Sequence, residues 1–167
     1  MSGLGKGSLY ATFGGKHELF LRALRRYVDA LDAALRESFA SAPRAVDALR
    51  DYLMMPVGDP AGAAARRGCF LANSTELAAA DPVLATEAGR AYESITALLR
   101  ECVVRAQEEG GLSTQRDPTE TARALLAAWQ DPTFIGRSGM DVKTLAPTAR
   151  SLVAQLLQAP DSVSAGG

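Results

Sequence analysis

Residues 16–39 carry apolar side chains at intervals of three and four residues, and this long periodic stretch restricts the fold most strongly. Such spacing places the apolar side chains on one face of an α-helix. At about 1.5 Å per residue the helix would be about 35 Å long, enough to connect an element at one end of the molecule to a distal body. The predicted core-facing residues are Leu19, Phe20, Ala23, Leu24, Tyr27, Val28, Leu31, Ala34 and Leu35.

Two Asp-Pro pairs mark the starts of further helices. Asp81–Pro82 and Asp117–Pro118 each place a capping Asp side chain before a proline in the first helical position. Glu120 is placed to complete a capping-box-like arrangement in the second of these helices. Gly110–Gly111 predicts that the first of them ends at about Glu109.

The other helices are predicted from their apolar spacing and from the breaks between them. They lie at about 44–55, 69–79 and 145–159. A loop is expected at 56–62, because its sequence PVGDPAG is rich in proline and glycine. The helix that begins at Pro118 is expected to kink or end at Pro132, because proline removes a backbone donor. No strand pattern is found, so the predicted fold class is all-α, a helical bundle.

The composition is that of one globular domain. A chain of 167 residues can bury a core without disulfides or metal. The apolar runs are too short for a membrane span, and no apolar signal segment follows Met1. The two cysteines, Cys69 and Cys102, do not form a disulfide framework, so a cytoplasmic location fits.

The charge is distributed unevenly along the chain. Residues 1–27 contain five basic residues and one acidic residue, a net charge of +4, whereas the whole chain carries −1. The other 140 residues therefore sum to −5. A basic end on an acidic body suits contact with a polyanion at one end only. Charge alone leaves a solvated basic face as an equal alternative.

The segment GLGKGSLYATFGGKHELF at residues 3–20 is short, basic and glycine-rich. Its KGSLYATF stretch, followed by a glycine turn and a lysine, resembles the end of the helix-turn-helix in tetracycline-repressor (TetR) family transcription regulators. GCFLANSTELAAADPV at 68–83, DPTETARALLAAW and RSGMD at 137–141 are similar to the body of one broad TetR subgroup. This resemblance implies a DNA-binding region at 1–20, a helical ligand-binding and dimerisation domain at 21–159, and a flexible tail at 160–167.

The resemblance implies that the recognition helix enters the major groove of a palindromic operator. The implied DNA contacts are Lys6, Gly7, Ser8, Tyr10, Ala11, Thr12 and Lys16. The alternative is a basic turn without a role in DNA binding. Because the chain begins two residues before the motif, the first two helices of the family's DNA-binding domain are expected to be missing. The start of the gene could be misassigned, or the gene could be a remnant. In either case, the specific affinity of this chain for DNA is expected to be weak.

The resemblance also implies a homodimer and a small hydrophobic effector. The last two long helices would form the dimer interface, with candidates Ala122, Leu125, Ala128, Trp129, Leu152 and Leu156. The effector would bind among the middle helices, with candidates Met54, Met55, Phe70 and Tyr92. Each of these residues could instead belong to an ordinary core. Either cysteine could sense oxidants if a basic neighbour lowered its thiol pKa, and a buried inert thiol is the alternative.

Enzymatic function is not predicted. His17 is the only histidine of the chain, so the sequence offers no metal-ligating cluster. A Ser-His or Cys-His catalytic pair could form only with His17. No cofactor and no metal are expected. The sequence therefore predicts a TetR-like, ligand-responsive repressor in an N-terminally truncated form. The alternative is a ligand-binding and dimerising module that no longer binds DNA and could titrate a full-length relative.

Overall fold

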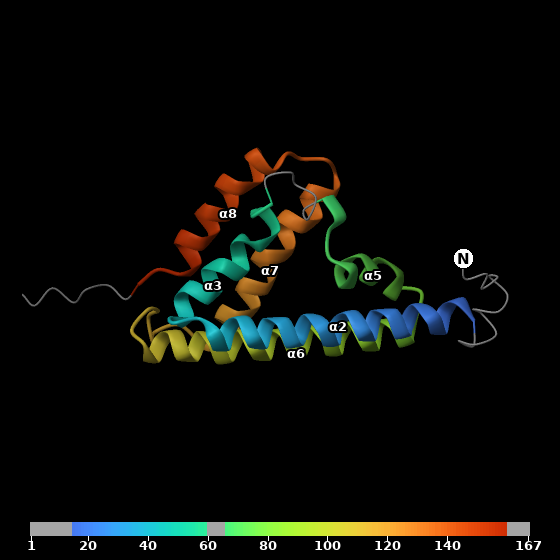
Figure 1. Ribbon diagram of the computed structural model, residues 1–167, viewed down its shortest axis with the longest axis horizontal. Coiled ribbons are helices and arrows are strands. Elements are labelled where there is room, and N and C mark those ends of the chain that lie inside the picture. Colours follow the sequence, from blue (N-terminus) through green and yellow to red (C-terminus); the bar gives the residue numbers. More distant parts are fainter. Residues whose placement is uncertain (1–14, 60–65, 160–167) are drawn as a thin grey trace, which may run out of the picture.

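The computed structural model describes residues 15–59 and 66–159, and every regular element in those residues is helical (Figure 1). The elements are α2 (Lys16–Ser41), α3 (Ala45–Met54), the 3₁₀-helix η1 (Met55–Val57), α5 (Phe70–Ala78), α6 (Pro82–Glu108), α7 (Pro118–Arg137) and α8 (Val142–Leu156). The all-α prediction is confirmed. None of the described helices is both long and apolar enough to cross a membrane.

The two longest helices, α2 and α6, lie side by side and run in the same direction (Figure 1). The residue numbers of their contacting pairs increase together along both helices, from Arg25 with Glu87 to Asp32 with Ser94. In Figure 1, α3, α7 and α8 are stacked over one half of this pair and α5 lies over the other half. Helix α6 packs against α2, α3, α5 and α7, so the core forms around it.

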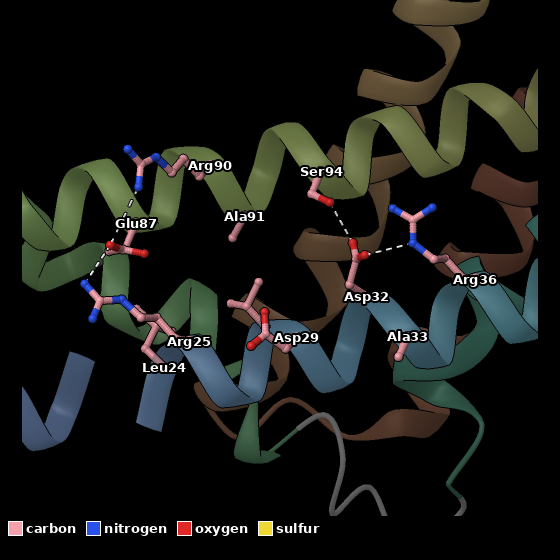
Figure 2. A pocket seen from close by; sticks show the side chains of 11 residues that line it. Leu24, Arg25, Asp29, Asp32, Ala33, Arg36, Glu87, Arg90, Ala91 and Ser94 are labelled. Carbon is pink, nitrogen blue, oxygen red and sulfur yellow. Dashed lines mark hydrogen bonds and ion pairs between the residues drawn. The ribbon is translucent and has the colours of Figure 1, made fainter. Parts of the chain in front are cut away.

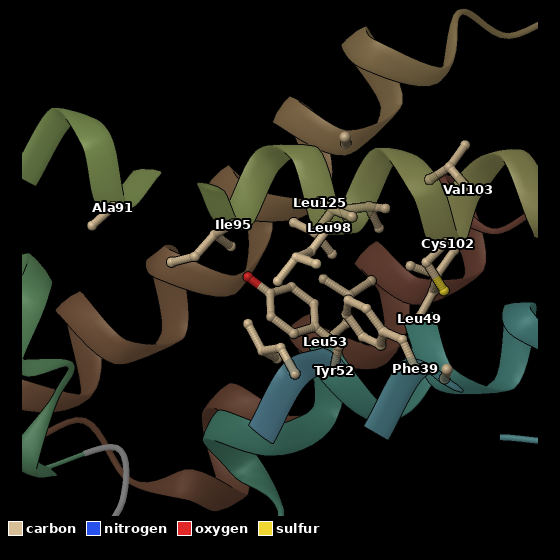
Figure 3. Close-up of a cluster of buried hydrophobic side chains, with 14 of the residues drawn as sticks. Phe39, Leu49, Tyr52, Leu53, Ala91, Ile95, Leu98, Cys102, Val103 and Leu125 are labelled. Atoms are coloured by element: carbon tan, nitrogen blue, oxygen red, sulfur yellow. The ribbon is translucent and has the colours of Figure 1, made fainter. Parts of the chain in front are cut away.

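The core shown in Figure 3 is built from buried side chains of α2, α3, α6 and α7. Leu49, Leu99 and Leu125 have no exposed surface. The rings of Phe39 and Tyr52 meet edge to face, with centroids 6.1 Å apart. This interlocking of α2, α3, α6 and α7 fixes the positions of the elements that surround the cavities described below.

The predicted caps hold the helix starts in place. The Asp81 carboxylate accepts hydrogen bonds from the backbone N–H groups of Val83 and Leu84, each at 3.1 Å. The Asp117 carboxylate accepts from the N–H of Glu120 at 2.8 Å. The Glu120 carboxylate pairs with Arg123, so only the Asp half of a capping box is observed.

Side chains of α6 hold the connection between α2 and α3. Arg105 donates to the carbonyl oxygens of Phe39 and Ala42 at 2.8 and 3.1 Å, which satisfies the end of α2. Glu109 accepts from the backbone N–H of Ala45 at 2.7 Å and so caps the start of α3. At its other end α2 begins after Gly15, where no side chain caps the helix. The C-terminal end of α2 is therefore joined to α6 through its backbone carbonyl groups, whereas at its N-terminal end the His17 side chain lies 3.3 Å from the Asp81 carboxylate.

The apolar face of α2 differs in part from the prediction. Leu21 is buried, although it was not expected in the stripe, whereas Ala23 and Ala34 are exposed. The buried positions follow Leu21, Leu24, Leu35 and Phe39 around the helix, and both alanines fall outside that face. Exposing the single methyl group of an alanine costs little free energy, so alanine positions are a poor guide to the buried face of a helix.

Three predicted boundaries are wrong. Helix α7 does not end at Pro132 but continues to Arg137 with Pro132 completely buried, whereas a kink at Pro132 stays a prediction. Within the predicted loop at 56–62, Pro56 and Val57 are buried in η1. Helix α8 begins at Val142 rather than near residue 145, because the Asp141 carboxylate accepts from the N–H of Lys143.

Candidate ligand-binding site

Two cavities lie against the segment that leads into α5. The first, which we term the Tyr27 cavity, has a volume of about 420 Å³ and opens to solvent. It is lined by Tyr27, Leu31, Met55, Pro56, Arg67, Gly68, Cys69, Phe70, Asn73, Trp129 and Thr133. The second, the Tyr92 cavity, has a volume of about 440 Å³ between α5, α6 and α7. Both volumes lie in the range of small-molecule sites.

Aromatic contacts make the walls of the Tyr27 cavity rigid. Phe70 meets the ring of Tyr27 edge to face at 5.4 Å and the ring of Phe20 at 5.5 Å. On the α7 side, Trp129 stacks on Tyr52 with ring centroids 5.8 Å apart and planes inclined by 20°. Offset stacking and edge-to-face contacts are the favoured arrangements of aromatic rings, so this wall is already formed without a ligand.

Two polar atoms of this lining are buried without a hydrogen-bond partner. They are the indole Nε1 of Trp129 and the amide Oδ1 of Asn73. The Asn73 amide is oriented by its own nitrogen, which donates to the carbonyl oxygen of Arg67 at 3.2 Å. A buried polar atom without a partner costs free energy, so such atoms are uncommon in a folded protein.

Gly68 allows Asn73 to approach. Its φ of +66° is a left-handed conformation, and a Cβ atom there would lie 3.1 Å from Asn73 Oδ1 and 2.7 Å from Arg137 Cδ. Any side chain would therefore be strained and would displace both neighbours. The turn before α5 is thus built so that Asn73 and Arg137 lie close to the backbone.

Tyr27 is the titratable residue of α2 in this cavity. Its hydroxyl lies 3.7 Å from Cys69 Sγ. Burial, and after it the neighbouring Cys69, raises the pKa of Tyr27 to about 12. Burial also raises the pKa of Tyr52 and of Tyr92. The phenols around the cavities therefore stay uncharged near neutral pH.

The two cysteines are buried and unpaired. Burial raises the pKa of the Cys102 thiol to about 11, against the opposing effect of Arg105, which is the opposite of what an activated thiol requires. Cys69 is 3% exposed and lies between the two cavities, with Arg67 in the lining of the first. Whether Cys69 senses oxidants stays a prediction.

A third hollow, of about 380 Å³, lies along the α2–α6 contact and is lined by charged side chains (Figure 2). Arg25 donates to Glu87 at 2.8 Å, and Ser94 donates to Asp32 at 2.6 Å. Asp32 also accepts from Arg36 at 3.0 Å. Because these groups satisfy one another and join α2 to α6, the hollow is a polar seam between two helices and a weaker candidate for a ligand site.

The structure divides the predicted pocket residues. Met55 and Phe70 line the Tyr27 cavity, and Tyr92 lines the other. Met54 instead packs against a small separate core formed by Val57, Val142, Leu145 and Ala149. Sequence reasoning missed Tyr27, Asn73 and Thr133. The signal for Asn73 was a polar residue inside the apolar run CFLANSTELAAA.

The predicted dimer residues also separate. Ala122 and Leu125 have no exposed surface in the single chain, and their place in a dimer interface stays a prediction. Trp129 faces the Tyr27 cavity. Ala128, Leu152 and Leu156 are half-buried on α7 and α8.

Of the predicted DNA contacts, Lys16 is exposed at the first residue of α2, and the others (Lys6, Gly7, Ser8, Tyr10, Ala11 and Thr12) lie outside the described residues.

Metal-ligating residues do not gather in the part of the chain that the structure describes. No three His, Cys, Asp or Glu side chains there lie close enough to hold an ion. The described lining of the Tyr27 cavity includes no carboxylate at all, and Arg67 is its one ionised side chain. The cavity can therefore exclude water and offer hydrogen bonds, but it offers no acid–base pair.

Comparison with known proteins gives two matches. Residues 45–152 match the sequence model of the tetracycline repressor-like C-terminal domain. The chain is also 28% identical, over 145 residues, to the uncharacterized HTH-type transcriptional regulator YezE of Bacillus subtilis (strain 168), a match that covers 86% of this chain and 75% of that protein. No solved structure matches the chain.

Proposed function

The chain belongs to the tetracycline repressor (TetR) family of transcription regulators, and we propose that it is a DNA-binding repressor whose affinity for its operator is controlled by a small molecule in the Tyr27 cavity. The observation that carries the proposal is the position of this cavity. Tyr27 and Leu31 of α2 form part of its wall, so a ligand there would act directly on the helix whose first residues, from Lys16, belong to the basic segment at 1–20.

The contacts of α2 indicate how such a signal could travel. Its C-terminal end is fixed by Arg105, whereas its N-terminal end has no side-chain cap. The pairs nearer the N-terminal end, His17 with Asp81 and Arg25 with Glu87, join side chains and not the α2 backbone, so in this proposal a ligand that pushes against Tyr27 displaces that end more easily. The ligand shifts the equilibrium only if it binds one position of α2 more tightly than the other.

A palindromic operator requires a dimer, because each half-site is contacted by one recognition helix. We propose that α7 and α8 form this dimer through the half-buried residues Ala128, Leu152 and Leu156, of which Ala128 and Leu156 also pack against the core of their own chain. Each patch would meet its own copy across a two-fold axis. Buried, unpaired cysteines suit a reducing compartment, and a cytoplasmic location is part of the proposal.

DNA contact is proposed for Lys6, Gly7, Ser8, Tyr10, Ala11, Thr12 and Lys16. Lys16 is supported by its exposure at the start of α2, where an ammonium group can reach a phosphate. Contacts to phosphates make binding strongly dependent on salt, because each one releases a counterion. Catalysis is not part of the proposal.

The test is fluorescence anisotropy of a labelled duplex from the promoter region of the protein's own gene, at several salt concentrations between about 50 and 200 mM. We expect salt-sensitive binding. Lys16→Ala should reduce the slope of log affinity against log salt by about one, whereas Lys143→Ala, an exposed lysine on α8, should not change it. Failure to bind even at the lowest salt would contradict the repressor and favour a ligand-binding module without DNA affinity.

A further inference from the structure

We propose that the Tyr27 cavity and the Tyr92 cavity are two halves of one site for an elongated amphipathic molecule, and that the side chain of Asn73 is the gate between them. This inference rests on the proposed function, because it extends the same cavity and names the chemical class of the effector. It is carried by the wall that the two cavities share, by the contacts of Asn73 and by the difference between the two linings.

The two cavities are separated by residues that border both of them. Cys69, Asn73 and Thr133 belong to both linings. A small hollow of about 10 Å³, about the size of one water molecule, also reaches both sides. It shares Trp129 with the Tyr27 cavity and Gln130 with the Tyr92 cavity. The wall between the two cavities is therefore a single layer of residues.

Asn73 is the part of this wall that can turn. Cys69 and Thr133 are 3% and 4% exposed, and the Thr133 hydroxyl donates to the carbonyl oxygen of Gln130 at 2.6 Å. Asn73 is half-buried, and within the described residues its amide is held by one hydrogen bond, to the carbonyl oxygen of Arg67 at 3.2 Å. Its Oδ1 is buried without a partner, which costs free energy in this position. Turning the amide toward water relieves that cost, so the closed position is only weakly favoured.

The two halves of the site differ in polarity. Leu31, Pro56 and Phe70 give the Tyr27 cavity a largely apolar lining. The Tyr92 cavity carries hydrogen-bonding side chains, among them Thr75 and Gln130. A molecule with a hydrocarbon body in the first half and a hydrogen-bonding end in the second matches both linings. Volumes of about 420 and 440 Å³ remain within the range of small-molecule sites when they are joined.

Two alcohols of different length, decan-1-ol and hexan-1-ol, test this proposal on the full chain. Met55 lines the Tyr27 cavity and not the Tyr92 cavity, whereas Ala127 lines only the Tyr92 cavity, so their methyl signals in a ¹H–¹³C spectrum report the two halves separately. We expect decan-1-ol to move both signals with the same dissociation constant, at one molecule per chain by calorimetry. Hexan-1-ol should bind at least about tenfold more weakly, because it buries fewer methylene groups.

Blocking one half tests whether the halves are joined. Ala127→Trp fills space in the Tyr92 cavity, so decan-1-ol affinity measured at the Met55 signal should fall at least about tenfold. Hexan-1-ol affinity at the same signal should stay within about twofold, because the shorter probe needs only one half. Ala97→Trp, which changes an exposed alanine of α6 outside both linings, is the matched control and should leave both probes unchanged.

Asn73→Ala tests the gate. The substitution removes the side chain that closes the wall, so decan-1-ol affinity should rise by at least about threefold, because no open state has to be populated first. Hexan-1-ol affinity at the Met55 signal should not change. A merely structural role of Asn73 would weaken both probes together. Circular dichroism and thermal unfolding confirm that each variant is folded.

The proposal is overturned if decan-1-ol moves only one of the two methyl signals, if two molecules bind per chain, if Ala127→Trp binds decan-1-ol like Ala97→Trp, or if Asn73→Ala gains no affinity for it. These results do not depend on DNA. A protein that binds its promoter duplex but fails these tests would retain the proposed repressor function and lose the joined site. A protein that passes them but binds no DNA would do the reverse.

Discussion

The indole of Trp129 lies on the phenol ring of Tyr52, with centroids 5.8 Å apart and planes inclined by 20°. Tyr52 belongs to α3 and is 4% exposed, whereas Trp129 belongs to α7 and lines the Tyr27 cavity. The stack thus connects the core to the cavity wall and fixes the orientation of the unpaired indole N–H.

Tyr52→Leu should lower the free energy of unfolding by about 2 to 3 kcal/mol, because it removes a buried ring together with its stacking contact on Trp129. Tyr52→Phe keeps the ring and should cost clearly less. Urea unfolding followed by circular dichroism measures both values. Equal losses in the two variants would show that the hydroxyl group, and not the stacked ring, is what stabilises this site.

Asp81→Ala should destabilise the fold by about 1 kcal/mol, because the first N–H groups of α6 lose their acceptor. The same carboxylate lies 3.3 Å from His17 Nδ1, so the start of α2 also loses a contact. Asp81→Asn retains a capping oxygen and is the matched control, expected to lose less. If the two variants unfold at the same urea concentration, the cap does not stabilise α6.

Leu152→Glu should convert the proposed dimer into a monomer, because it places a charge on the outer face of α8. Size-exclusion chromatography with light scattering, at micromolar protein, gives the mass directly. Leu77→Glu is the matched control, because Leu77 is 56% exposed on α5, away from the proposed interface. A wild-type monomer, or a Leu152→Glu dimer of full mass, would refute this interface.

Alkaline pH should destabilise the protein through Tyr27. An unfolded tyrosine has a pKa near 10, whereas burial and Cys69 raise that of Tyr27 to about 12 in the fold. Between these values the unfolded chain loses the proton that the folded chain retains, so the free energy of unfolding falls as the pH rises. Below about pH 10 this contribution is constant.

Tyr27→Phe isolates that effect, because Tyr52 and Tyr92 titrate in both proteins. Urea unfolding at several pH values between about 9 and 11 should show a shallower decline for Tyr27→Phe than for the wild type. Parallel curves would mean that the environment of Tyr27 does not perturb its ionisation.

The helices could be predicted from the sequence wherever one local signal decides the outcome. Asp81 and Asp117 stand before prolines, and the helices begin there. Pro132 shows the limit of such reasoning. The missing N–H is a local property, but α7 continues past Pro132, which is completely buried, and no local sequence pattern predicts that burial.

The candidate site was predictable only in part for the same reason. Phe70 and Met55 are large apolar residues of the middle helices, and both line the cavity. The resemblance to the TetR family places Trp129 in the dimer interface, because it lies on one of the last two long helices. Its distinguishing feature, an indole N–H without a partner, depends on which helices surround it.

Helix α6 touches α2, α3, α5 and α7, whereas α5 rests mainly on α6 and α2. Local opening should therefore be most costly along the middle of α6 and least costly at α5, so amide hydrogens would exchange with deuterium first in the α5 segment. The helix that carries Asn73 would then be the one that opens locally most often. The binding of a ligand in the Tyr27 cavity should therefore be detected first as slower amide exchange in α5, before any larger rearrangement of the bundle.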